Sequence, residues 1–441
     1  MDSLKIPKRI LSSLISSLSA GVVPRSGAPY VAIGREKEIT ALLSDLNNVE
    51  EGGSAMRFII GRYGSGKSFL IQLMRGYSLE RGFVTCDCDL SPERRLCSGK
   101  GNGVATYREL VRNMAVKTCP DGGALSSVIS KWLSGLQSEA VADGILPESP
   151  DFEAAVRKKV FAVLSGLENN VGGFDFSLVL SKYYNAEVSG NDEMKSSCLR
   201  WLRGEYTTKT EARQALSVGC IIDDENWFDY IKLWAEFVRL AGYRGLVLFI
   251  DECVNLFKIT NRIGRENNYE KLLSMFNDTL QGRAKGLDII FGGTPEFLED
   301  RRRGLFSYEA LRSRLADGRF SEGYTDMLSP VIRLRPLSGN ELLALIRRVT
   351  VLHGQYYSWE PRAADGDMVL FLNEVTSRVG AGTMVTPREI IRDYLSVLNL
   401  LLQNPEAQFG KIIGSTLDNG SVAEAKSQKE DDVFSLDDIE I

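Results

Sequence analysis

The sequence predicts an α/β protein in which helices cover a five-stranded parallel β-sheet. Short apolar runs alternate with longer segments of helical periodicity, and this alternation is typical of a parallel sheet. One run passes directly into a glycine-rich loop and another ends in two adjacent carboxylates, as strands that carry a site at their carboxyl ends do. The expected strands lie at residues 58–60, 82–87, 245–250, 287–291 and 331–334.

Length and composition set the broad class. The chain has 441 residues, of which 44% are hydrophobic and 25% charged, as expected for a globular protein of two to three domains or of one domain with large insertions. The net charge of −5 resides in residues 421–441, which hold seven acids and two lysines, so the rest of the chain is neutral. These values argue against a largely disordered chain and a globally basic nucleic-acid coat protein, although local basic patches remain compatible with them.

Cysteine and histidine usage argues against a metal centre. The chain has seven cysteines without a C-x-x-C pair, and His353 is its single histidine. We therefore expect free thiols, mostly buried, and a cytoplasmic location. No apolar run approaches the ~18 residues that a membrane-spanning helix needs, so we expect no membrane partner. The first apolar stretch instead predicts an amphipathic helix that packs on the rest of the protein.

The chain divides into four expected parts. These are an N-terminal helix and linker (1–32), an α/β core (33–335), a helical lid (336–403) and an acidic tail (404–441). The core contains a large helical insertion at about 100–242. The tail is polar enough to be disordered, and its last residues place apolar side chains among acids. It could dock on a partner, cover a basic groove or simply add solubility.

The glycine-rich loop predicts a nucleotide-binding site. Residues Gly61-x4-Gly66-Lys67-Ser68 follow a strand and precede a helix, which is the P-loop pattern in its correct context. Glycines let backbone N–H groups turn toward phosphates, and the following helix directs its positive end at them. Lys67 is expected to neutralise the β- and γ-phosphates of ATP, and the Ser68 hydroxyl to bind Mg²⁺. The expected nucleotide-binding residues all belong to this loop and the first turn after it: Gly61, Gly64, Ser65, Gly66, Lys67, Ser68 and Phe69.

The strand at 245–250 ends in a second candidate pair, Asp251 and Glu252. Asp251 is expected to hold Mg²⁺, and Glu252 to orient and activate the attacking water as general base. In isolation, two acids at a strand end could simply be solvated. Together with a P-loop they predict ATP hydrolysis.

These residues resemble the AAA+ ATPases, and within them the branch of origin-recognition initiators. The resemblance begins at Ile33-Gly34-Arg35-Glu36, which matches a loop near the adenine, and it implies a helical lid. It implies that Thr294 is the sensor 1 residue, that Arg314 is an arginine finger completing a neighbouring subunit's site, and that Arg388 is the sensor 2 residue. The alternatives are a strand cap for Thr294 and surface positions for the arginines. The long insertion departs from this branch, and we expect no winged helix after the lid.

Three further segments resemble the ATP-binding BrxD proteins of bacterial BREX phage-exclusion systems. They are Leu18-Ser-Ala-Gly-Val-Val-Pro24, Asp89-Leu-Ser-Pro-Glu-Arg-Arg95 and the stretch from Thr386 to Leu398. This resemblance implies a role in antiphage defence, with DNA-handling partners such as a helicase.

Three consecutive arginines, at 301–303, are candidates for phosphate contacts that do not depend on DNA sequence. The alternative is that they form a solvated segment whose charge Glu299 and Asp300 balance.

The sequence thus predicts a Mg²⁺-dependent, homo-oligomeric AAA+ ATPase that acts on or loads onto DNA in a defence system. The alternative is a nucleotide-gated scaffold or signalling switch that assembles defence partners with little turnover.

Overall fold

The computed structural model describes residues 6–318, 324–377 and 385–414. It forms two compact units. The core unit comprises Thr40–Ile60 and Tyr77–Ile332, and the lid unit comprises Met1–Ile39, Gly61–Gly76 and Arg333–Ile441. Most of the expected acidic tail, residues 415–441, lies outside the described residues.

The core unit is built on a parallel sheet of five strands, as the sequence predicts. The strands are β1 (Ser54–Ile60), β2 (Val84–Asp89), β3 (Leu246–Asp251), β4 (Leu287–Gly293) and β5 (Val331–Arg333). Their order is β2-β3-β4-β1-β5, which places β4 between the strand that leads into the glycine-rich loop and the strand that ends in carboxylates. Every residue of β4 is buried, because a central parallel strand has helices on both faces.

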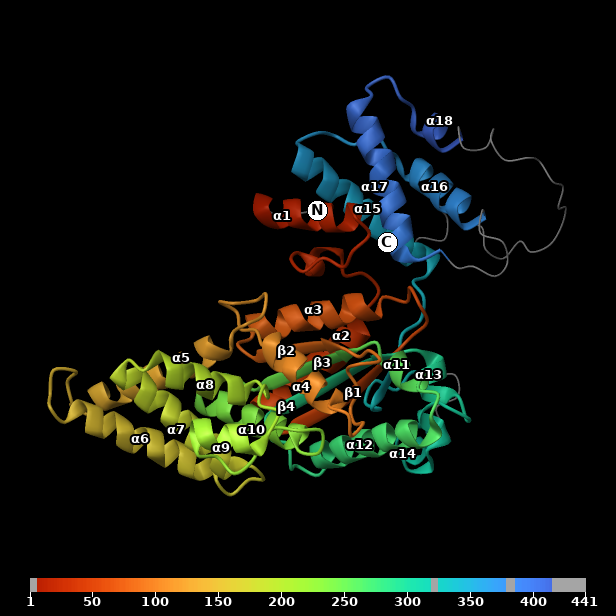
Figure 1. The fold of residues 1–441 in the computed structure, drawn as a ribbon. Helices are drawn as coiled ribbons and strands as arrows, with labels where there is room; N and C mark the ends of the chain where they lie inside the picture. The colour runs from red at the N-terminus through yellow and green to blue at the C-terminus, as the bar shows by residue number, and fades with distance from the viewer. Residues whose placement is uncertain (1–5, 319–323, 378–384, 415–441) are drawn as a thin grey trace. The chain divides into compact units, whose positions relative to one another are not determined.

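Seven helices fill the chain between β2 and β3. They are α4 (Asn102–Arg112), α5 (Leu125–Ala142), α6 (Phe152–Leu167), α7 (Gly173–Ser189), α8 (Asp192–Leu202), α9 (Lys209–Leu216) and α10 (Trp227–Leu240). Figure 1 shows that α5–α9 extend from one side of the sheet. This is the helical insertion that the sequence pattern indicates at about 100–242.

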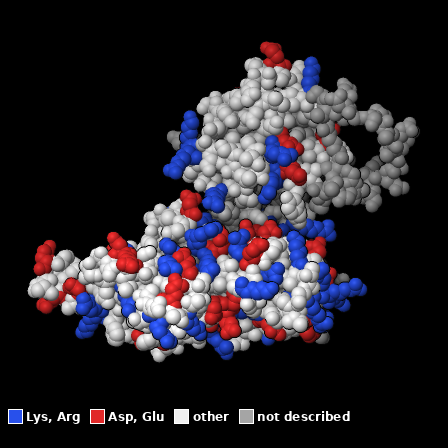
Figure 2. Space-filling model, viewed as in Figure 1, with Lys and Arg blue, Asp and Glu red and all other residues white. Residues whose placement is uncertain are grey.

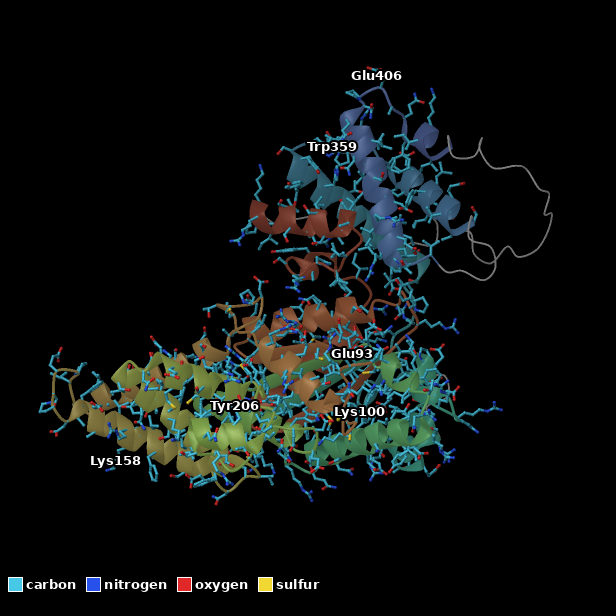
Figure 3. All side chains as sticks on the ribbon, in the orientation of Figure 1. Glu93, Lys100, Lys158, Tyr206, Trp359 and Glu406 are labelled. Carbon is cyan, nitrogen blue, oxygen red and sulfur yellow. The ribbon has the colours of Figure 1, made fainter. Side chains whose placement is uncertain are left out.

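The insertion has an aromatic core that joins it to the α/β part. Phe176 of α7 packs edge-on against Trp234 of α10, with ring centres 5.1 Å apart. The Trp234 indole donates a hydrogen bond to the Tyr107 hydroxyl on α4. Tyr206, labelled in Figure 3, is also buried, and the Arg200 guanidinium lies 4.6 Å from its ring centre. The insertion and the sheet therefore share one continuous hydrophobic core.

The rest of the core unit supplies the surroundings of the strand ends. Its helices are α2 (Glu36–Glu50), which begins in the lid unit, α11 (Val254–Phe257), α12 (Arg262–Leu280), α13 (Pro295–Glu299) and α14 (Glu309–Leu315). Helix α12 packs on β1, and α11 contacts both α12 and α13. These contacts place the segment after β3 beside the segment after β4.

The lid unit has its own hydrophobic core. Its helices are α1 (Lys8–Ser19), α3 (Lys67–Glu80), which ends in the core unit, α15 (Gly339–Tyr357), α16 (Asp365–Ser377), α17 (Pro387–Gln403) and α18 (Phe409–Gly414). The predicted amphipathic helix is α1, whose apolar face contacts α15 and α17. Residues 404–414, expected as the start of the tail, instead include α18, which buries Phe409 and Ile413. Within the described part of the chain, no helix combines the length and hydropathy needed to cross a bilayer.

Candidate active site

The glycine-rich loop connects β1 to α3. It begins after Ile60, and α3 begins at Lys67. Gly64 and Gly66 have φ angles of +79° and +88°, a region that side chains other than glycine rarely adopt. The Lys67 ammonium donates hydrogen bonds to the loop carbonyls of Gly61 (2.9 Å) and Arg62 (3.2 Å). The loop is thus a strand–turn–helix connection whose carbonyls bind the Lys67 ammonium. Such a connection can bind phosphate groups.

Several contacts within the lid unit hold this loop. The Ser65 carbonyl accepts a hydrogen bond from the Arg35 guanidinium at 2.8 Å. A Cβ built on Gly64 would come within 2.4 Å of the Thr386 methyl group, so the loop touches the residue that caps α17. Phe69, in the first turn of α3, packs against the hydrophobic core of the lid helices. Of the residues expected to bind nucleotide, Lys67 is half-buried and Ser68 is exposed.

The parallel strands bring several chain segments to one edge of the sheet. Ile60 pairs with Gly293 in the β1–β4 ladder, and Ile250 pairs with Phe291 in the β3–β4 ladder. The chain therefore enters the glycine-rich loop at the edge where β3 ends in Asp251 and where β4 is followed by Thr294. Ligands of open parallel sheets bind at this carboxyl edge.

Glu252 stands out by its backbone. Its φ angle is +57°, in the left-handed region, which is uncommon for a glutamate. Its N–H donates to the Asp251 carboxylate (2.8 Å), and its carbonyl accepts the Asn255 N–H (3.0 Å). The Cys253 N–H then bonds to the Gly292 carbonyl of β4. The carboxylates at the strand end are thus held by a tight turn in a sparsely populated conformation, a feature that clusters at functional sites.

A third carboxylate, Asp89, belongs to the same edge. It is the last residue of β2 and lies directly opposite Asp251 in the β2–β3 ladder. Its side chain reaches solvent, yet desolvation by the surrounding protein, and then the charges of Asp251 and Glu252, raise its pKa. Asp89 was not among the predicted site residues. Its position at the end of a strand was the available signal, but the register that sets it beside Asp251 is a property of the folded sheet.

The three residues assigned by resemblance have the following positions. The Thr294 hydroxyl accepts the Phe297 N–H at 3.4 Å, so it caps α13. Arg314 is exposed on α14, where its guanidinium donates to the Ala310 carbonyl of the same helix. Arg388 is the exposed second residue of α17, and its stem lies beside Gly21. Sensor and finger functions for Thr294, Arg314 and Arg388 remain predictions.

The basic residues after β3 and β4 fall into two groups. Arg265 is buried, and its guanidinium donates to the Ile259 carbonyl at 2.8 Å. Arg303 donates to the same carbonyl at 3.3 Å and lies over the Phe257 ring. These two arginines therefore hold the loops together, whereas Arg301 and Arg302 are exposed. On the face seen in Figure 2, basic and acidic side chains of the core unit are interspersed.

Within the described ranges, the cysteine and acidic side chains do not form a metal-binding cluster. The seven cysteines are free, and no group of three His, Cys, Asp or Glu side chains in those ranges could hold an ion.

Comparison with known proteins adds a family. A search of curated proteins finds no relative of this chain. A family model described as BREX system ATP-binding protein BrxC/D matches residues 6–417, which is most of the sequence. That match includes the glycine-rich loop, the carboxyl edge of the sheet and the lid helices. The chain therefore belongs to the family of BREX system ATP-binding proteins BrxC/D.

Proposed function

We propose that this protein is a Mg²⁺-dependent ATPase of the AAA+ class that acts on or loads onto DNA in BREX-type antiphage defence. The observation that carries the proposal is the common edge of the sheet. A P-loop follows β1 there, and β3 ends there in a carboxylate pair with a strained backbone. Family membership supports ATP binding and the BREX role.

The P-loop residues would bind the triphosphate. Backbone N–H groups of the loop and the first turn of α3 would donate to phosphate oxygens, and the Lys67 ammonium would leave its loop carbonyls for the β- and γ-phosphates. Ser68 and Asp251 offer the oxygen ligands that Mg²⁺ prefers, and Asp89, opposite Asp251, adds negative potential. When bound, Mg²⁺ neutralises charge that develops on the phosphates.

Glu252 would act as general base. Its carboxylate would accept a proton from a water molecule and orient that water in line with the γ-phosphate. Thr294 would hold the same water or the γ-phosphate, and Arg388 would reach the γ-phosphate from α17. Arg314 would serve the site of a neighbouring subunit, so turnover would require a homo-oligomer.

The DNA contact would be independent of sequence. Arg301 and Arg302 are exposed after α13, and Lys258 is exposed on the neighbouring loop. Such side chains contact phosphates without reading bases, so binding would weaken steeply with salt. A helicase or another DNA-handling protein of the same defence system would be the functional partner.

A nucleotide-gated scaffold is the second candidate, and one observation favours it. The P-loop contacts Thr386 of α17 and also Arg35, which binds the Arg335 carbonyl just before the lid helices, so nucleotide could control the lid without turnover. Glu252→Gln and Lys67→Ala separate the two functions. DNA-stimulated hydrolysis and phage protection that are both lost in Glu252→Gln support the ATPase. Protection that survives Glu252→Gln but is lost in Lys67→Ala supports the scaffold.

A further inference from the structure

Arg35 makes an unusual set of contacts for an arginine near a phosphate loop. Its side chain is 4% exposed, and one terminal nitrogen, Nη2, donates to two carbonyls: Ser65 (2.8 Å) in the P-loop and Arg335 (2.7 Å) at the start of the lid. Its other terminal nitrogen pairs with the buried Glu38 at 3.4 Å. Burial lowers the pKa of Arg35, and the nearby charges of Glu38 and Glu341 offset this desolvation only in part.

On the lid side of this contact, residue 335 is fixed to the start of α15. Arg335 forms a bidentate ion pair with Glu341, which also completes the capping box of α15 with Ser338. Gly34 has a φ of +70°, and a Cβ there would come within 2.4 Å of the Glu341 carboxylate. Gly34, which precedes Arg35, therefore fits closely against Glu341 in the first turn of α15.

A second contact joins the loop to another lid helix. Gly64, in the P-loop, meets Thr386, whose hydroxyl accepts the Glu389 N–H at 3.3 Å in the capping box of α17. Arg388 lies two residues beyond Thr386. The loop thus touches the beginning of α15 through Arg35 and the beginning of α17 through Gly64.

We propose that Arg35 is a positioning residue that couples phosphate binding at the P-loop to the lid, by holding the Ser65 and Arg335 carbonyls on one guanidinium group. A phosphate that draws the P-loop N–H groups inward also moves the Ser65 peptide, and Arg35 transmits this movement to residue 335 and α15. Thr386 confines the other side of the loop, so α17 and Arg388 follow. This inference rests on the proposed ATP binding.

The test uses the full-length protein with four variants. Arg35→Met removes both hydrogen bonds with little change in volume, and Arg35→Lys keeps a cation that can still donate to both carbonyls. Arg347→Met is the matched control, because it removes a guanidinium of α15 that pairs with Asp365 and leaves the contacts of Arg35 and Arg335 in place. Thr386→Ser keeps the capping hydroxyl and removes the methyl group that faces Gly64, so it probes the second contact without loss of the cap.

Hydrogen exchange with and without ATPγS, together with ATP affinity and kcat, reads the coupling. In the wild type we expect ATPγS to slow exchange in residues 61–68, 335–342 and 386–394. In Arg35→Met, saturating ATPγS should still protect 61–68, and 386–394 through the Gly64–Thr386 contact, but should no longer protect 335–342. The kcat of Arg35→Met should fall about tenfold, because the charge-assisted hydrogen bonds that position the lid are lost. Its Kd for ATP should change by less than about threefold, because Arg35 does not itself bind the nucleotide in this account. Arg35→Lys should restore part of the lid protection, Arg347→Met should match the wild type, and Thr386→Ser should lose protection at 386–394 alone.

Full lid protection in Arg35→Met would overturn the inference while leaving ATP binding intact. Equal loss of protection and thermal stability in Arg35→Lys and Arg35→Met would also overturn it, because that pattern marks a merely structural arginine. If Arg35→Met does not fold, Thr386→Ser with unchanged protection at 386–394 has the same meaning. Absence of protection at 61–68 in the wild type would instead contradict ATP binding itself, and the coupling with it.

Discussion

Thr386, the N-cap of α17, lies directly against Gly64 of the P-loop, where a Cβ would approach the threonine methyl group to 2.4 Å. The loop requires glycine at position 64 for two reasons. Its φ of +79° is unfavourable for other residues, and Thr386 leaves no room for a Cβ. A helix that begins beside a phosphate loop directs its positive end toward the phosphates. The contact between Thr386 and Gly64 therefore joins the lid helix α17 directly to the loop that is expected to bind phosphate.

Gly64→Ala should weaken ATP binding by at least about tenfold, because the added methyl group clashes with Thr386 and strains the loop. Gly76→Ala is the matched control. Gly76 lies within α3, and a Cβ there meets nothing within 4 Å, so this change should leave affinity unaltered and stabilise the helix by about 0.5–1 kcal/mol. Titration with a fluorescent ATP analogue compares the two. Equal affinity in both variants would contradict the close contact.

Arg57 forms a largely buried ion pair with Asp45 in the core unit. It lies on β1, its side chain is 10% exposed, and it donates two hydrogen bonds to Asp45 and others to the carbonyls of residues 327–329. Arg57→Met leaves Asp45 and these carbonyls unpaired and should lower the free energy of unfolding by about 3 kcal/mol. Arg157→Met removes an exposed partner of Glu153 and should cost less than about 1 kcal/mol. Urea denaturation measures both, and similar losses would argue against a special contribution from Arg57.

Asp288 of β4 is fully buried, and neither carboxylate oxygen has a hydrogen-bond partner. Burial, and then the charge of Asp45, raise its pKa well above the ordinary value, although Arg57 opposes the shift. A raised folded-state pKa stabilises the protein below the ordinary pKa of aspartate, and this contribution is lost as the pH rises toward the folded value. Asp288→Asn should therefore increase Tm, and increase it more at alkaline than at acidic pH. A lower Tm across the whole range would show that the carboxylate has a partner that stabilises its charge.

His353 should make the stability of the lid unit depend on pH in the opposite direction to Asp288. The Trp359 indole, labelled in Figure 3, can only donate, so His353 Nδ1 accepts its hydrogen bond, and Nε2 donates to Asn399. Burial lowers the pKa of His353 below 6.5. A lowered folded-state pKa contributes stability above the ordinary value, and this is lost as the pH falls toward the folded value.

The chain has one histidine, so a single imidazole signal in the NMR spectrum reports this titration. We expect its midpoint below 6.5. We also expect Tm to fall between about pH 7.5 and pH 5 in the wild type and to fall less in His353→Gln. A midpoint above 6.5 would mean that the folded state favours the charged imidazole and would contradict this account of His353.

Sequence patterns predicted the sheet well because buried parallel strands are continuous apolar runs. The five expected strands coincide with β1–β5, although β1 begins at Ser54, four residues earlier than expected, and the other strand ends differ by at most two residues. Helix α12 begins at Arg262, where the Asn261 side chain caps it by accepting the Gly264 N–H. The first turns of α12 are polar, so the apolar pattern alone does not mark this start.

The parts of the site that escaped prediction depend on contacts between distant segments. Asp89 joins the carboxylate pair only through the register of β2 with β3. Arg35 stood in a recognised motif, yet its two carbonyl partners are 30 and 300 residues away in the chain. No local pattern encodes such partners, because they are set by tertiary packing.

The central claim is that the loop at 61–68 and the pair Asp251–Glu252 form one ATPase site. Its most direct test measures ATP binding and hydrolysis by the purified full-length wild type, Lys67→Ala and Glu252→Gln, with and without DNA. We expect wild-type turnover, loss of ATP binding in Lys67→Ala, and ATP binding without turnover in Glu252→Gln. A wild-type protein that binds no ATP, or a Glu252→Gln variant that hydrolyses ATP at the wild-type rate, would contradict the claim.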